Sequence, residues 1–273
     1  MLEYGADQNA RDALGRSPLY LAAHSGFAQI EREFDSCADV TNLLLERGAE
    51  LDIFTSPIVD RLDDLRQLLE TDPALIHARD PAGNTPLHLA ALNGKSAALR
   101  ILLEKGAAIN SPNNHGETPL SLAALGSRQS IVNDRGEPPI AAIRDGFREV
   151  VENLIDRSAA CDVFSAARLG LVDRLESCLE TDPDLANATL PDGCTLLRCA
   201  TELWQWQGGN AMLKVVHLLL ERGARPDIWT ASALNQQEPV ARLLSEDPAL
   251  LHAFDGDLAP IHCAGTGSVT HNS

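Results

Sequence analysis

The sequence predicts an all-α protein, built as a solenoid of stacked helix-turn-helix units with β-turn tips. Apolar residues make up 44% of the 273-residue chain but aromatic residues only 4%. A core of Leu, Ala, Ile and Val suits closely packed helices better than a sheet sandwich. The pentapeptide LETDP also occurs twice, at 69–73 and 179–183, and a near copy, LSEDP, follows at 244–248. Recurrence of this kind indicates repeated structural units.

One complete unit is visible at 80–111, DPAGNTPLHLAALNGKSAALRILLEKGAAINS. After a polar turn, Thr85 is a favourable N-cap and Pro86 a favourable first helical residue. Gly94 ends this short first helix, and Gly106 ends a second, Leu-rich helix. Each helix alone is too short to be stable in water. The helix pair therefore has to stack on another copy of itself.

The stretch GNTPLHLAALNG followed by LLEKGAAIN resembles an ankyrin repeat, a unit of about 33 residues with a β-turn and two antiparallel helices. The resemblance covers essentially the whole chain and implies a curved solenoid. It also implies that the His of the PLH and PIH motifs, His88 and His262, braces the turn with the neighbouring Thr and is not catalytic. Other copies of the motifs lie at 15–26 (GRSPLYLAAHSG), 43–50 (LLLERGAE), 116–125 (GETPLSLAAL) and 218–225 (LLLERGAR).

Short units that lack the TPLH motif begin at Asp52, Asp162 and Asp227. We predict that LETDP and LSEDP end their second helices, because proline cannot continue a helix and restricts the residue before it. The whole chain, 1–273, is then a single array of about seven to eight units. In order, the units are partial (1–10), full (11–51), short (52–79), full (80–111), irregular (112–161), short (162–188), full (189–226), short (227–254) and partial (255–273).

Both outer units are incomplete. We interpret the chain as a fragment of a longer array, because complete arrays of this type are usually sealed by polar terminal repeats. Uncapped ends would favour self-association.

Insertions interrupt the full-type units between their first and second helices, and such insertions emerge on one edge of a solenoid. Two of these loops carry aromatic residues, Phe34 in one and Trp204 with Trp206 in the other. Exposed Trp side chains in a loop are candidate anchors for a protein partner. The alternative is that they fold back over the helices as extra core, because Trp is buried on average.

The resemblance further implies a recognition surface made of the turn tips and the exposed positions of the first helices. The short units interrupt this row of positions. Mapped onto this sequence, the candidate protein-binding residues are Arg16, His24, Asn84, Asn93, Asn114, His115 and Glu117.

The net charge of −17 makes nucleic acid and anionic membranes unexpected partners. Solubility is the plainest explanation of this charge, although it also permits a basic protein partner. No signal peptide is visible, and no apolar stretch is long enough to span a bilayer. The six Cys form no CxxC pair. Reduced, buried thiols and a cytoplasmic location are therefore expected.

Chemical motifs are weak throughout the chain. The spacing of Cys194 and Cys199 does not match a structural zinc site, even with His217 or the His262–Cys263 pair. The GTGS stretch at 265–268 has neither the preceding strand nor the following Gly-Lys of a phosphate loop. No nucleophile lies in a recognisable catalytic context. We therefore expect no catalytic residues, cofactor or metal.

The predicted function is that of a non-catalytic protein–protein interaction scaffold. The alternative is that the array forms the targeting or substrate-binding portion of a larger enzyme or effector, whose catalytic domain lies outside this sequence.

Overall fold

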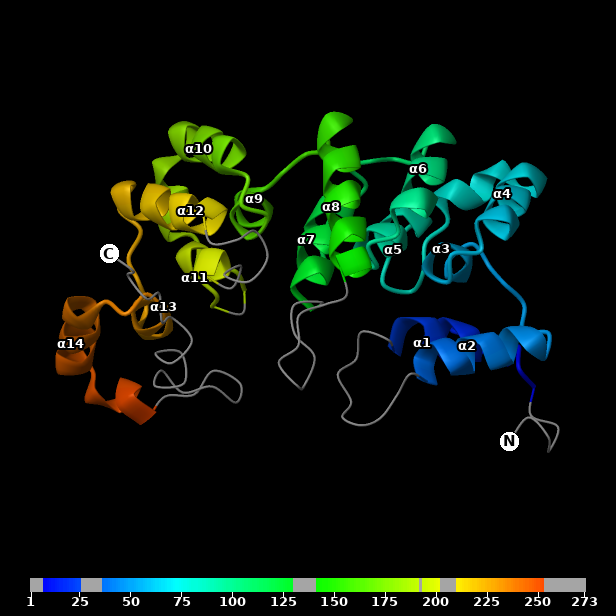
Figure 1. The fold of residues 1–273 in the computed structure, drawn as a ribbon, viewed down its shortest axis with the longest axis horizontal. Coiled ribbons are helices and arrows are strands. Elements are labelled where there is room, and N and C mark those ends of the chain that lie inside the picture. The colour runs from blue at the N-terminus through cyan, green and yellow to red at the C-terminus, as the bar shows by residue number, and fades with distance from the viewer. Residues whose placement is uncertain (1–6, 26–35, 130–140, 192, 202–209, 253–273) are drawn as a thin grey trace. The chain divides into compact units, whose positions relative to one another are not determined.

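The computed structural model describes residues 7–25, 36–129, 141–191, 193–201 and 210–252 (Figure 1). These residues form short paired helices, with one isolated β-bridge between Thr189 and Thr195. The predicted all-α class is confirmed. Contacts divide the chain into two compact units, 1–160 and 161–273, which are described separately. A single array over 1–273 stays a prediction. Among the described helices, none is both long and apolar enough to cross a membrane.

In unit 1, one row of first helices and one row of second helices stack in parallel layers. In the first row α1 contacts α3, α3 contacts α5 and α5 contacts α7, while in the second row α4 contacts α6 and α6 contacts α8. The helices of this unit are α1 (Pro18–Ser25), α2 (Ser36–Glu46), α3 (Thr55–Ile58), α4 (Leu62–Thr71), α5 (Pro86–Leu92), α6 (Ser96–Glu104), α7 (Pro119–Gln129) and α8 (Ala141–Asp156).

Small and aliphatic side chains fill the core of unit 1. Ala90, Ala91 and Leu87 on α5 are fully buried, as are Leu99 and Leu102 on α6. The Ala side chains let α5 lie close to its neighbours, and the Leu side chains fill the space between the two layers. Burial of this kind supplies the stability that helices of seven and nine residues lack on their own.

Unit 2 repeats the arrangement. Its first helices, α9 (Val163–Arg168), α11 (Leu196–Thr201) and α13 (Ile228–Ala233), contact one another in sequence. Of its second helices, α10 (Val172–Thr181) contacts α12 (Asn210–Glu221), and α14 (Gln237–Glu246) packs on α13. The core between them is aliphatic and includes Leu175, Leu179, Leu196, Val215 and Leu219.

The pentapeptide LETDP ends the second helix of the first two short units, as predicted. Helix α4 ends at Thr71 and α10 ends at Thr181. The next residue, Asp72 or Asp182, is extended, and its carboxylate accepts a hydrogen bond from the backbone N–H two residues later, at 3.0 and 3.1 Å. Each Asp thereby caps a 3₁₀ helix, Pro73–His77 or Pro183–Asn187.

The LSEDP copy behaves in the same way. Asp247 follows α14, and its carboxylate accepts a hydrogen bond from the Ala249 N–H at 3.0 Å. A 3₁₀ helix, Pro248–His252, begins at the next residue. The three copies therefore mark the same change from an α-helix to a 3₁₀ helix.

Replacing the capping carboxylate tests this account. Asp72→Ala removes the acceptor for the Ala74 N–H, and we expect it to lower the free energy of unfolding by about 1 kcal/mol. Glu70→Ala is the control, because it removes an exposed carboxylate from the same helix end. Urea unfolding followed by circular dichroism measures both changes. Equal effects of the two substitutions would contradict the capping role.

Candidate functional site: turn tips and a pocket between them

Three turn tips in unit 1 share one backbone design. We name them tip 1 (12–16), tip 2 (80–84) and tip 3 (113–117). In each, the first residue donates its N–H to the carbonyl of the fifth residue at 2.9–3.0 Å, and a Gly at positive φ occupies the fourth position. The side-chain oxygen of the first residue accepts the N–H of the fifth at 2.8–2.9 Å. The tips are therefore rigid before any partner binds.

Tips 2 and 3 are joined directly to each other. The Asn114 N–H donates to the Ala82 carbonyl at 3.0 Å, and the Asn113 amide donates to the Asn84 amide oxygen at 2.9 Å. Asn114 Nδ2 adds a bond to the Pro81 carbonyl at 3.1 Å. The approach is so close that a Cβ on Gly83 would lie 2.4 Å from Asn114 Oδ1.

His88 connects the first helix to the neighbouring tip, which confirms its predicted bracing role. The Thr85 N–H donates to His88 Nδ1 at 3.0 Å, so this nitrogen carries no proton. Nε2 then carries the proton and donates to the Glu117 carbonyl at 3.1 Å. Burial lowers the pKa of His88, because the charged form loses its hydration. His262 lies outside the described residues.

Tip 1 has no such neighbour, because the next unit, 52–79, is short. The short unit enters α3 through Asp52, whose Oδ1 accepts the N–H groups of Phe54 and Thr55 at 3.0 and 2.8 Å. It builds no tip of its own. A Cβ on Gly15, the equivalent of Gly83, would accordingly meet no atom within 4 Å.

Tyr20 spans the place of the missing tip. It follows Pro18 and Leu19 in the PLY motif, the position that His88 holds in PLH. Its hydroxyl donates to Asp80 Oδ2 at 2.9 Å, so the longer side chain reaches the first residue of tip 2 past the short unit. Burial is the main cause that raises the pKa of Tyr20, and the negative charge of Asp80 raises it further.

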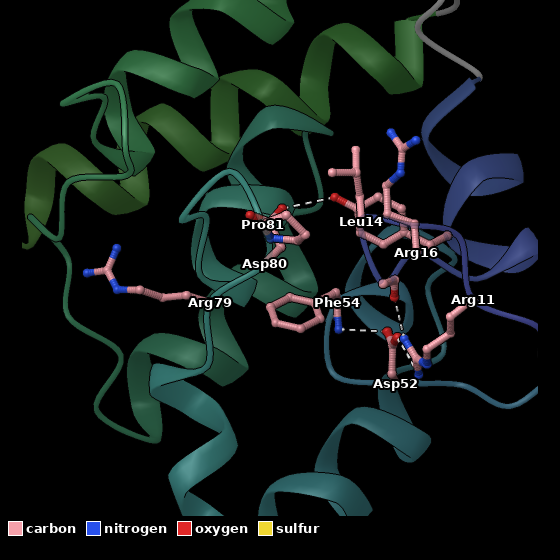
Figure 2. Close-up of a pocket in the computed structure, with 10 residues that line it drawn as sticks. Arg11, Leu14, Arg16, Asp52, Phe54, Arg79, Asp80 and Pro81 are labelled. Carbon is pink, nitrogen blue, oxygen red and sulfur yellow. Dashed lines mark hydrogen bonds and ion pairs between the residues drawn. The ribbon is translucent and has the colours of Figure 1, made fainter.

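A pocket of about 380 Å³ occupies the space between tips 1 and 2. Figure 2 shows Phe54 and Asp52 of the short unit beside the residues of the two tips. The pocket thus combines apolar surface with charged groups. Its lining residues are Arg11, Leu14, Gly15, Arg16, Tyr20, Asp52, Phe54, Arg79, Asp80 and Pro81.

The three guanidinium groups in the pocket lining make different contacts. Arg79 points away from the other labelled side chains (Figure 2) and donates to the carbonyls of Gly83 and Pro112 at 2.8 Å. Arg16 forms an ion pair with Asp12 at 2.7 Å, and the pKa of Asp12 is lowered by the hydrogen bonds that Arg16 donates. Both groups brace the tips.

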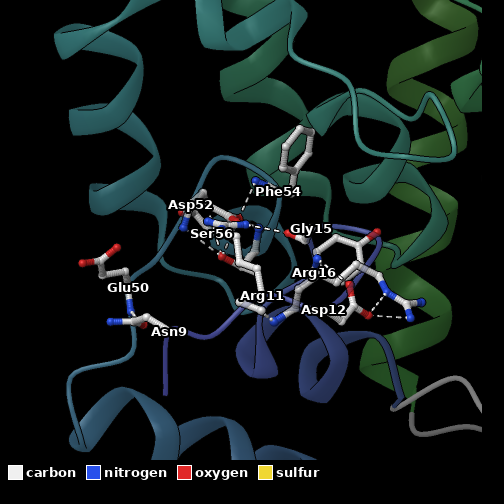
Figure 3. A network of polar contacts seen from close by, with 12 residues as sticks. Asn9, Arg11, Asp12, Gly15, Arg16, Glu50, Asp52, Phe54 and Ser56 are labelled. Carbon is white, nitrogen blue, oxygen red and sulfur yellow. Dashed lines mark hydrogen bonds and ion pairs between the residues drawn. The ribbon is translucent and has the colours of Figure 1, made fainter. Parts of the chain in front are cut away.

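Arg11 is the least constrained of the three. It donates to the Gly15 carbonyl at 2.8 Å (Figure 3), as Arg79 does to the Gly83 carbonyl of tip 2, and its side chain is 55% exposed. Its second nitrogen lies 3.9 Å from Asp52 Oδ2, which is too long for a hydrogen bond. The Arg11–Asp52 pair is therefore the loosest charged contact in the pocket.

The structure brings several predicted site residues together on the tips. Arg16 lies on tip 1, Asn84 on tip 2, and Asn114, His115 and Glu117 on tip 3. Asn114 and His115 are exposed, whereas Asn84 and Glu117 are partly buried.

Of the other predicted residues, the structure describes only the side chain of Asn93, and this residue is not part of the tip surface. Asn93 is only 8% exposed, and its amide donates to the Leu89 carbonyl at the end of α5. His24 lies on α1, and its side chain is not described. Phe34, Trp204 and Trp206 lie outside the described residues.

Sequence reasoning missed the pocket residues Arg11, Tyr20, Asp52 and Phe54. A signal was present, since Tyr replaces His in the PLH motif directly before a unit without a tip. Within the described residues, no three His, Cys, Asp or Glu side chains are grouped so as to hold a metal ion.

Comparison with known proteins agrees with this geometry. A family model described as ankyrin repeats in many copies matches residues 68–123, which include tips 2 and 3. The chain is an ankyrin repeat protein.

Two curated relatives share parts of the ankyrin array. The serine/threonine-protein kinase VIK of Arabidopsis thaliana is 51% identical over 47 residues, which are 17% of this chain and 11% of the kinase. A Caenorhabditis elegans homolog of transient receptor potential cation channel subfamily A member 1 is 30% identical over 108 residues, 39% of this chain and 9% of the channel protein. The chain thus spans about a tenth of the length of these relatives.

A solved structure of a predatory endopeptidase from Bdellovibrio bacteriovorus in complex with an immunity protein contains a similar chain. That chain is 21% identical, with a TM-score of 0.46, and the match covers 72% of this chain and 98% of that chain.

The contrast between Gly83 and Gly15 gives a matched test of how the ankyrin tips are coupled. Both have positive φ, 80° and 74°, so Ala at either position costs roughly 1–2 kcal/mol of backbone strain. Gly83→Ala also forces Cβ against Asn114, and we expect about 1–3 kcal/mol more destabilisation than for Gly15→Ala. Urea unfolding of the two variants measures the difference. Equal losses would show that tips 2 and 3 are not in close contact.

The buried His88 predicts a pH dependence of stability. Its lowered pKa means that the unfolded chain takes up a proton at higher pH than the folded chain does. The free energy of unfolding should therefore fall as pH drops below about 6.5, the unperturbed value. His88→Gln keeps an acceptor and a donor without titrating, so its stability should fall less between pH 7.5 and pH 5. Parallel stability curves for the two proteins would contradict this assignment.

Proposed function

We propose that this ankyrin array is a non-catalytic scaffold that binds a segment of a partner protein at tips 1 and 2. Ankyrin repeats are generally protein-binding and typically non-catalytic. The observation that carries the proposal is the pocket between the two tips, which exists because the short unit lacks a tip of its own. An anchoring side chain of the partner would enter this space.

Binding in this way costs little conformational entropy. The tips are held by hydrogen bonds between their own first and last residues, and Arg11 and Arg79 each hold a tip carbonyl at 2.8 Å. A preordered surface loses less freedom when the partner docks. Leu14, 53% exposed on tip 1, adds apolar contact area at the rim of the pocket.

The charge of the chain favours a basic partner segment. The net charge of −17 speeds encounter with a basic surface. Among the described residues, Asp52 Oδ2 has only the long contact to Arg11, so an incoming ammonium or guanidinium group can pair with it. The half-buried Phe54 also lines the pocket, and an aromatic face attracts a cation. The inserted loop with Trp204 and Trp206, in unit 2, remains a separate proposed contact for a protein partner.

Selection from a displayed random peptide library tests the proposal. We expect selected peptides to carry a basic residue, and Leu14→Ser, which removes apolar contact without adding charge, should reduce their affinity at least about tenfold, roughly 1.4 kcal/mol. Affinity should also fall as salt rises. Leu43→Ser is the matched control, because Leu43 is 42% exposed on α2 and is not in the pocket lining. Equal loss in both variants, or peptides unaffected by Leu14→Ser, would argue against this site.

A separate observation supports the alternative function, in which the array is the targeting portion of a larger enzyme or effector. The two curated relatives are a kinase and a channel homolog of which the matched ankyrin stretch is about a tenth. An array that targets a larger enzyme or effector would use the same surface. A catalytic domain encoded beside this sequence would favour that alternative, whereas further repeats would favour the scaffold alone.

A further inference from the structure

Two thiols meet at the start of α11 in unit 2. Thr195 caps this helix, since its Oγ1 accepts the Arg198 N–H at 3.2 Å. Cys194 comes immediately before the cap, and Cys199 is the fourth helical residue. Side chains at these two positions of a helix often pack on one another. Here the two sulfur atoms lie 3.1 Å apart.

The pairing is particular to this repeat. The tip before α5 places Asn84 and Leu89 at the same two positions around its cap. The tip before α7 places Glu117 and Leu122 there. A polar and an aliphatic side chain in contact do not react with each other, whereas two thiols in contact can be oxidised to a disulfide.

We propose that Cys194 and Cys199 are a modification site, where a low-molecular-weight disulfide such as glutathione disulfide converts the pair to an intramolecular disulfide. The Cys194 thiolate attacks one sulfur of the oxidant, forming a mixed disulfide and releasing one glutathione thiolate. The Cys199 thiolate then attacks the Cys194 sulfur and releases the second. The two protons of the protein thiols pass to the two glutathione thiolates, so two thiols are oxidised and one disulfide is reduced.

The difference in burial between the two thiols indicates which of them reacts first with the oxidant. Cys194 is partly exposed, so an oxidant can reach it, whereas Cys199 is fully buried. Cys199 can react only with a sulfur already beside it, which makes it the resolving thiol. The helix start holds the two atoms together in the folded chain only, so oxidation is coupled to folding.

The disulfide would fix a turn tip of unit 2. Cys194 is the last residue of the turn that begins at Leu190, and its carbonyl accepts the Leu190 N–H at 2.9 Å. A bond from Cys194 to Cys199 ties this turn covalently to the body of α11. The oxidised repeat therefore presents a tip with less freedom than the reduced one.

The same unit supplies a control pair. Cys161 and Cys178 interact electrostatically, but burial raises the pKa of Cys161 to about 12. Little thiolate is then present at neutral pH, and the thiolate is the reactive form. We expect this pair to stay reduced under conditions that oxidise Cys194 and Cys199.

The test is oxidation of the full chain in glutathione redox buffers at pH 7.5, followed by acid quench, alkylation and peptide mass spectrometry. In the folded chain, the Cys194–Cys199 link should form at an oxidised-to-reduced glutathione ratio at least about tenfold lower than in urea, because folding raises the effective concentration of one thiol at the other. Cys199→Ala should accumulate a mixed disulfide of Cys194 with glutathione. Cys178→Ser should oxidise like the wild type.

Three results would overturn the proposal. One is a Cys194–Cys199 link that forms equally well in folded and urea-unfolded chain, and another is a folded chain in which both thiols remain fully alkylated. The third is Cys199→Ala without glutathione on Cys194. Circular dichroism confirms that each variant is folded, and Cys194→Ser, at the partly exposed position, is the second variant that must abolish the link.

Discussion

Contact between neighbouring units is the constraint on which the rest of the structure depends. Helices of four to sixteen residues are marginal or unstable by themselves in water, so each has to bury its apolar face on the next. Along the first helices, α1, α3, α5 and α7, this packing fixes the distance between units. Side chains at equivalent motif positions then meet equivalent partners. His88 reaches the Glu117 carbonyl because tip 3 stands one unit away.

The same regular spacing explains why the missing turn tip of the short unit leaves a cavity. Stacking continues through α3 and α4 of the short unit, so tips 1 and 2 are held two units apart. The short unit supplies Asp52 and Phe54 at that level but no turn to fill the space. The long side chain of Tyr20 forms one hydrogen bond across the gap. The remainder of the gap is the pocket.

Motifs of consecutive residues were predictable from the sequence, because their contacts are local. The cap at Thr85 and the helix ends at LETDP involve partners within a few residues, and the structure confirms both. Tyr20 and Asp80 lie 60 residues apart, and their contact depends on how many tips intervene. The contact between Cys194 and Cys199 was local as well. Zinc-ligand spacing does not reveal it, because the contact joins the residue before a helix cap to the fourth residue of the helix.

The hydrogen bonds of Asp80 decide where the pocket can accept a charge. Its two oxygens take the Asn84 N–H, the Asn84 amide and the Tyr20 hydroxyl at 2.8–3.1 Å. A tyrosine hydroxyl keeps its proton at neutral pH, and the raised pKa of Tyr20 extends this to higher pH, so the hydroxyl remains a donor. A cation approaching Asp80 would have to displace one of these donors. Asp52 keeps one oxygen that meets only Arg11 at 3.9 Å, so a basic side chain of a partner gains most at Asp52. In the proposed binding mode, Tyr20 therefore leaves Asp52 as the carboxylate that pairs with a basic side chain of the partner.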